Sequence, residues 1–231
     1  MSEEELLSQL ERVKELNSDL KKELQNNLAS YDVTLKTRNL TEEIFVKLRI
    51  CLDKLIFYYL NKNHYLVDLS KVSFPISKTQ NDFNSVITNY GLKNINQIHP
   101  QFFSLLFDSQ PFSSKEKEIL TILHEKGSKE KHQFLIKEKK ETNHIRTTFK
   151  SQNGEISWSK QGVFFGEGVS MNGVPINPAT QEPAFIPPTH KLIRHYEISI
   201  KLVDKNIEIT FLCDSLIKLV KEIVTKTFKL K

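Results

Sequence analysis

One segment, residues 41–63, constrains the fold more than any other because it is the longest apolar run in the chain. Neither proline nor glycine interrupts it, and its second half, residues 55–60, is apolar nearly all round, which is typical of a helix covered on several sides. Asn39 followed by Glu42 has the spacing of a capping box at a helix start. We therefore predict a central, buried helix over 41–62.

This helix carries a charged pair on a face that is otherwise apolar. At roughly 100° per residue, Arg49 and Asp53 share a stripe with three apolar side chains, Phe45, Ile56 and Leu60. Lys54 falls on another face, where its ammonium group reaches water. Arg precedes Asp here, the weaker order for an exposed i,i+4 ion pair. Surface stabilisation therefore does not explain the pair, which indicates a buried polar network or a functional site.

Composition excludes several functional classes. A hydrophobic content of 39% with 26% charged residues is ordinary for a soluble globular protein. Only five of the 33 basic residues are arginine, and arginine makes most bidentate contacts to bases, so sequence-specific DNA recognition is disfavoured while looser polyanion contact is allowed. The charges within 41–63 argue against a membrane span. The acidic start lacks the apolar core of a signal peptide, so we expect a cytoplasmic protein without membrane contact.

The N-terminal residues 3–29 have leucines and valine at three-to-four spacing, which predicts an amphipathic helix. Two arrangements follow from this pattern. The helix folds back on 41–62 as a long arm, or it pairs with a partner as a coiled coil, in which Asn17 would fix the register. The two cysteines, Cys51 and Cys213, lie in or beside apolar segments, so we expect buried thiols rather than a disulfide.

The periodicity changes after the helical part, which predicts an α+β fold. We expect a helical, bundle-like part over 1–136, and antiparallel strands with a C-terminal helix over 137–231. The pattern allows the two parts to share one core or to have separate cores. Asn172-Gly173 predicts a type I′ hairpin, and the alternating stretch 207–212 predicts a strand. Asp214 or Ser215 is then the expected cap of the last helix.

Common catalytic motifs are absent: the chain has no Walker loop, GxGxxG, HExxH, CxxC or G-x-S-x-G. The histidines are scattered and lack the spacing of a metal pair. We therefore expect neither a cofactor nor a metal. The polar residues that remain as site candidates are Arg49, Asp53 and the cluster Glu130, Lys131 and His132.

The order of short motifs carries a resemblance. The chain contains, in sequence, LRICLDKL, FPI, GL, QP and LTILHEKGSKEKHQFL. This order resembles that of a widespread group of uncharacterised bacterial proteins with LRSALDHL, FPI, GL, QP and a leucine-rich helix followed by DKHR. The resemblance covers residues 41–136 and extends less closely into the predicted C-terminal strands. The RSALDH piece is in turn similar to the signature of HEPN-type helical ribonucleases, an arginine followed a few residues later by a histidine on a long helix.

The resemblance implies a role for each matching residue. Arg49 takes the arginine position and Asp53 the acidic position, while Lys131 and His132 match the KH of DKHR, with Glu130 in place of its Asp. In HEPN enzymes the long helix pairs across a dimer, which implies a homodimer through 41–62. The histidine position, however, is Lys54 here, and a lysine with a pKa near 10.4 holds a phosphate but is a poor general base.

Three functional hypotheses follow. The first is a non-catalytic HEPN-like module that binds RNA or a protein partner, in a bacterial defence or toxin–antitoxin setting, with Lys54, Glu130 and Lys131 as ligand-binding residues. The second is a metal-independent ribonuclease that uses Arg49, Asp53 and His132. The third is a scaffold subunit with an N-terminal coiled coil. A buried network in which Arg49 and Asp53 neutralise each other is the purely structural alternative. The lysine at position 54 favours binding over catalysis.

Overall fold

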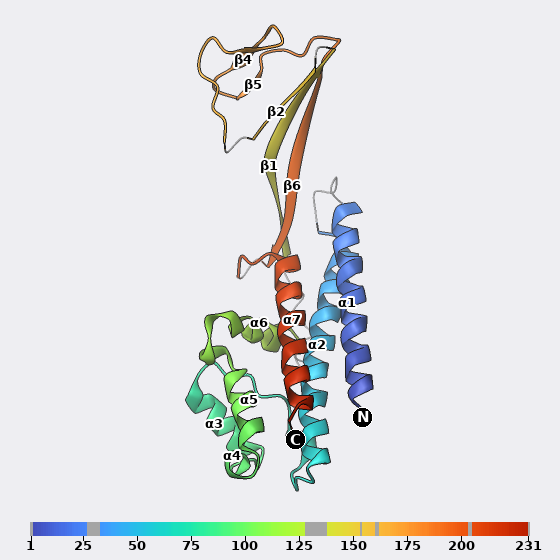
Figure 1. Cartoon of the computed structure of the whole chain (residues 1–231), viewed down its shortest axis with the longest axis vertical. Coiled ribbons are helices and arrows are strands. Elements are labelled where there is room, and N and C mark those ends of the chain that lie inside the picture. The colour runs from blue at the N-terminus through green and yellow to red at the C-terminus, as the bar shows by residue number, and fades with distance from the viewer. Residues whose placement is uncertain are drawn as a thin grey trace. The chain divides into compact units, whose positions relative to one another are not determined.

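The computed structural model describes residues 2–26, 33–127, 138–152, 154–159, 162–202 and 205–230. The chain has N-terminal helices, then antiparallel strands, and then a C-terminal helix, which confirms the predicted α+β class. Contacts divide it into two compact units (Figure 1). The helical unit comprises Met1–Lys139 and Ile200–Lys231, and the strand unit comprises Lys140–Ser199.

The central helix α2 spans Leu35–Lys62 and therefore begins before the predicted start at 41. Its N-cap is Thr34, whose hydroxyl oxygen accepts a hydrogen bond from the Thr37 N–H at 3.1 Å. Asn39, the predicted cap, lies inside the helix, so that prediction was wrong.

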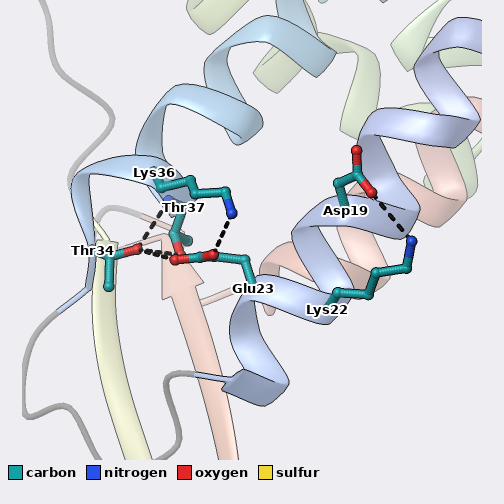
Figure 2. A network of polar contacts seen from close by, with 6 residues as sticks. All are labelled: Asp19, Lys22, Glu23, Thr34, Lys36 and Thr37. Atoms are coloured by element: carbon teal, nitrogen blue, oxygen red, sulfur yellow. Dashed lines mark hydrogen bonds and ion pairs between the residues drawn. The ribbon is translucent and has the colours of Figure 1, made fainter.

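A polar network explains why α2 begins at this point (Figure 2). Helix α1, Glu3–Asn26, presents the buried carboxylate of Glu23. One carboxylate oxygen accepts from the Thr34 hydroxyl at 3.0 Å, and the other lies 2.9 Å from the Lys36 ammonium. The network therefore ties the first turn of α2 to the last turns of α1.

Helix α1 packs along α2, which confirms the prediction of an arm that folds back on the central helix. The buried stripe of α1 comprises Leu6, Leu10, Val13, Leu16 and Leu20. Asn17 does not face a second chain in this arrangement. Its side-chain amide donates to Asp214 of the C-terminal helix at 2.7 Å, and Lys21 lies 2.8 Å from the same carboxylate.

The C-terminal helix α7 spans Ile209–Phe228, with Glu208 at its N-cap position. Residues 209–212 were predicted as strand, and Asp214 or Ser215 as the cap, and both predictions were wrong. The segment forms a helix because its apolar residues also have helical spacing, which places them all in the core. The residues at this spacing are fully buried, and they are Ile209, Leu212, Cys213 and Leu216. Helix α7 packs on α1 and α2 and belongs to the helical unit, whereas the sequence analysis grouped it with the strands.

Short elements complete the described part of the helical unit. They are η1 (Leu69–Lys71), α3 (Gln80–Asn89), α4 (Ile95–Ile98), α5 (Pro100–Asp108), η2 (Pro111–Ser113), η3 (Lys115–Lys117) and α6 (Ile119–Gly127). Pro100 is the first residue of α5, where its missing N–H leaves no helical hydrogen bond unmade. Helix α6 ends against α2, because a Cβ added to Gly127 would lie 2.9 Å from the carbonyl oxygen of Phe45. Only glycine allows this close approach.

The strand unit has two small sheets (Figure 1). One has the order β2-β1-β6, from Gly154–Ser159, Glu138–Ser151 and Lys191–Leu202, and the other has the order β3-β4-β5, from Ser170–Met171, Val174–Asn177 and Glu182–Pro183. Asn172 and Gly173 join β3 to β4 with φ of 48° and 79°, which confirms the predicted hairpin. The unit has its own core of buried residues, Phe149, Trp158, Met171, Val174 and Ile176.

Candidate functional site

Arg49 and Asp53 bracket the backbone of a single residue, Phe74. The Arg49 guanidinium, 6% exposed, donates from Nη2 to the carbonyl oxygen of Phe74 at 2.9 Å. The N–H of Phe74 donates to Asp53 Oδ1 at 2.8 Å, and the same Oδ1 lies 3.0 Å from Arg49 Nη2. The pair therefore satisfies both backbone polar groups of Phe74, in the way that a neighbouring β-strand would.

Gln110 completes the support of this segment. Its Oε1 accepts from the Ser77 N–H at 2.9 Å, and its Nε2 donates to the carbonyl oxygens of Pro75 at 2.9 Å and Leu106 at 2.7 Å. Segment 74–77 lies outside any helix or strand, so side chains must satisfy its buried backbone groups. Pro75 suits the position because it has no N–H that would need a partner.

We call Arg49, Asp53 and Gln110 with segment 74–77 the backbone bracket. It brings together three pieces of the sequence pattern, LRICLD, FPI and QP, at one place in the helical unit. The sequence analysis identified Arg49 and Asp53 but missed Gln110. The available signal was a proline-containing extended segment with no strand pattern beside it, because such a segment needs hydrogen-bond partners from side chains.

The backbone bracket engages Nη2 of the Arg49 guanidinium but not Nη1. Nη1 of Arg49 is buried and has no hydrogen-bond partner among the described residues. The close approach of Gly127 places the end of α6 against Arg49, with 3.0 Å between the Arg49 Cβ and a Cβ added to Gly127. Glu130, Lys131 and His132, the remaining site candidates, follow Gly127 in the chain and lie outside the described residues.

The structure separates Lys54 from Arg49. Whereas Arg49 points toward Phe74, Lys54 lines surface hollows. One of them, of about 700 Å³, also has Glu4 and Glu5 in its wall. Two others lie along α2. One hollow of about 480 Å³ is lined by Lys54, Phe57, Tyr58, Asn61 and Lys62. The other, of about 200 Å³ between α1 and α2, is lined by Gln9, Arg12, Lys47, Ile50 and Lys54. We call this surface, with both hollows, the Lys54 seam.

Some cations of the Lys54 seam form ion pairs with neighbouring carboxylates and others do not. Lys47 lies 3.5 Å from Glu43, and Arg12 lies 2.9 Å from Glu15. Lys54 makes no hydrogen bond or ion pair with any residue that the structure describes. Lys54 and the exposed Lys62 are therefore the cations of the seam that form no ion pair with a described residue.

The thiols offer no reactive group. Cys51 is fully buried on α2, and burial raises the pKa of its thiol to about 11. Cys213 is also buried and forms no disulfide. Because the thiolate is the nucleophile, the raised pKa makes Cys51 poorly suited to covalent catalysis at neutral pH. Among the described ranges, no group of histidine, cysteine, aspartate and glutamate side chains has the geometry of a metal site.

No helix within the described ranges combines the length and the apolar character needed to cross a membrane.

Comparison of the chain with protein-family models, with curated proteins and with solved structures found no match.

Proposed function

We propose that this chain is a non-catalytic, HEPN-like module that binds single-stranded RNA along the Lys54 seam. The observation that carries the proposal is the position of Lys54, which lines both hollows of the seam and forms no ion pair with a described residue, although Glu4 and Glu5 line a third hollow beside it. An unpaired ammonium that lines a surface hollow is an electrostatic site for a phosphate.

The rest of the seam has the chemistry that single-stranded RNA requires. Lys47, Lys54 and Lys62 lie along one side of α2 and span about 22 Å at 1.5 Å per residue. Phe57 and Tyr58 are half-buried in the same surface, and the Lys62 ammonium lies 5.8 Å from the Tyr58 ring. Proteins that bind single strands without sequence preference combine such a basic track with aromatic rings on which bases stack.

The state of Arg49 supports binding without cleavage. Its guanidinium is engaged by Phe74 and Asp53 and is buried, so it does not face the surface that Lys54 lines. A lysine ammonium group holds a phosphate by its charge but is a poor general base for a 2′-hydroxyl. Without a general base to activate the 2′-hydroxyl, an RNA phosphate held by Lys54 is bound but not cleaved.

The test is a titration of a fluorescently labelled uridine 20-mer, measured by anisotropy at several salt concentrations. We expect Lys54→Glu to weaken binding and to lower the slope of log K against log salt by about 1. Lys93→Glu is the matched control, because Lys93 is exposed, lies outside the seam and makes the same change in net charge. Equal loss of affinity in both variants would contradict the proposal, as would cleavage of the RNA by the wild-type protein.

A further inference from the structure

Exposed apolar side chains concentrate in the strand unit. Among the described residues, five of the ten large hydrophobic side chains that are exposed belong to this small unit, and they are Ile156, Val163, Phe164, Phe185 and Ile186. Phe164 is 80% exposed and Phe185 is 57% exposed. A patch of this kind marks an interaction surface.

The two phenylalanine loops are held to one another. The Gln181 side chain accepts from the Phe165 N–H at 2.6 Å and donates to the Phe165 carbonyl oxygen at 3.2 Å. This bond pair fixes the loop of Phe164 against the turn that leads into β5 and Phe185. The apolar patch therefore has a defined geometry and is not a pair of unrelated loops.

The charge of this region decides the kind of partner. Between 162 and 190 the sequence contains only two charged residues, Glu167 and Glu182, in a chain that is 26% charged. Glu182 is neutralised by Arg194, with both oxygens 2.8 Å from guanidinium nitrogens. Residues 162–190 contain no lysine or arginine for a polyanion or for anionic lipid headgroups, so this segment fits an apolar protein surface.

Beside this patch lies an open sheet edge. Strand β2 is an outer strand of the sheet β2-β1-β6, and it leads directly into the loop of Val163 and Phe164. Its sequence GEISWS has one charge, Glu155, which is paired with Lys150 at 2.7 Å, and has no lysine or proline. The other outer strand, β6, carries Lys191, Arg194, Glu197 and Lys201. Charged side chains protect an edge from further pairing, and β2 lacks that protection.

We propose that a second copy of this chain pairs with β2 across a two-fold axis, so that the two three-stranded sheets join into one and the apolar patches cover each other. An antiparallel pair formed by a strand and its own copy is self-complementary, as a two-fold interface requires. The core-facing apolar residues of α2 are already buried within a single chain, so they are not available for a two-fold interface.

The exposed area of the apolar patch is too small for a stable dimer interface unless the edge of β2 is also buried. At about 150–250 Å² per aromatic side chain, Phe164 and Phe185 expose roughly 200–340 Å² together. A stable interface buries about 800 Å² on each partner. The aromatic patch alone therefore falls short, and the edge of β2 with Ile156, Val163 and Ile186 supplies the remainder.

Light scattering coupled to size-exclusion chromatography measures the mass of the full chain in solution. We expect the wild-type protein to have about twice its chain mass of 26.9 kDa, and Phe164→Ser/Phe185→Ser to have the mass of one chain. The control Leu66→Ser/Ile98→Ser removes two equally exposed apolar side chains from the helical unit and should leave the dimer intact. Trp158 is the single tryptophan and lies in the core of the strand unit, so its fluorescence verifies that each variant is folded.

Cysteine scanning tests the strand pairing itself. Glu155→Cys, Ser157→Cys and Ser159→Cys place thiols on one face of β2. If the two-fold axis of an antiparallel self-pairing passes through one of these positions, that residue lies opposite its own counterpart. We expect that variant to form a disulfide-linked dimer under mild oxidation, while the buried native thiols do not react. A wild-type chain that is monomeric at 100 µM, a concentration of about 10⁻⁴ M and far above typical interface dissociation constants, would overturn the proposal.

Discussion

Arg49 and Asp53 show how a residue pattern reveals polar groups without revealing what they bind. Helical periodicity placed both side chains on an apolar stripe, and the structure buries Arg49 as that stripe implies. The partner is a backbone segment, Phe74, and not another side chain. A backbone has no sequence signature of its own, so the target of the pair could not be predicted from residue types alone. The same reason explains why Gln110 was missed.

The backbone bracket predicts a stability cost for Arg49→Ala. Removal of the guanidinium leaves the Phe74 carbonyl without a partner and deprives Asp53 of its counter-charge, so we expect the free energy of unfolding to fall by about 2–4 kcal/mol. Urea denaturation followed by circular dichroism at a helical wavelength measures the change. Lys54→Ala, on the same helix but bonded to no described residue, should change it by less than about 0.5 kcal/mol. Equal, small effects would show that the bracket does not hold the fold together.

Cys51 predicts a pH dependence of stability. Burial raises the pKa of its thiol to about 11, whereas an unfolded cysteine titrates near 8.5–9. Between these values the unfolded chain loses a proton that the native chain keeps, so the free energy of unfolding falls as pH rises from about 9 to 11. Denaturation at pH 8 and pH 10 should therefore show a smaller loss for Cys51→Ala than for the wild type. An identical loss in both proteins would exclude the Cys51 thiol as its source.

At the scale of elements, the spacing of apolar residues predicted where helices lie, whereas tertiary packing determines where they begin and end. The leucine stripe of α1 followed from the sequence. The stretch 207–212 did not, because IEITFL fits an alternating and a helical pattern equally well. Packing of Ile209 and Leu212 into the helical core selects the helix. The start of α2 was missed because its cap depends on Glu23, which is distant in sequence.

The start of α2 can be tested with two substitutions of opposite expected sign. Thr34→Ala removes the cap and its bond to Glu23, so we expect a loss of about 1 kcal/mol in the free energy of unfolding. Asn39→Ala, at an exposed position inside the helix, should be neutral or stabilise by a few tenths of a kcal/mol, because alanine is the better helix former. Urea midpoints measure both. A destabilised Asn39→Ala beside an unchanged Thr34→Ala would restore the start that the sequence pattern suggested.

At the scale of the whole molecule, the division into two units has a thermodynamic consequence. The core of the strand unit consists of few buried residues, whereas the helical core extends over α1, α2, α6 and α7. Small cores give marginal stability. We expect Trp158 fluorescence to report unfolding at a lower urea concentration than helical circular dichroism does. Coincident transitions would show that the two units unfold cooperatively.

The assignment of function depends on a separation of roles along one helix. On this account Arg49 and Asp53 hold the chain to itself, and Lys54 on the neighbouring face holds an anion. The most direct test is the affinity of the Lys54→Glu protein for the single-stranded uridine 20-mer, with Lys93→Glu as its charge-matched control. The account predicts weaker binding and a shallower salt dependence in Lys54→Glu alone. Wild-type affinity in Lys54→Glu, or the same loss in Lys93→Glu, would contradict it.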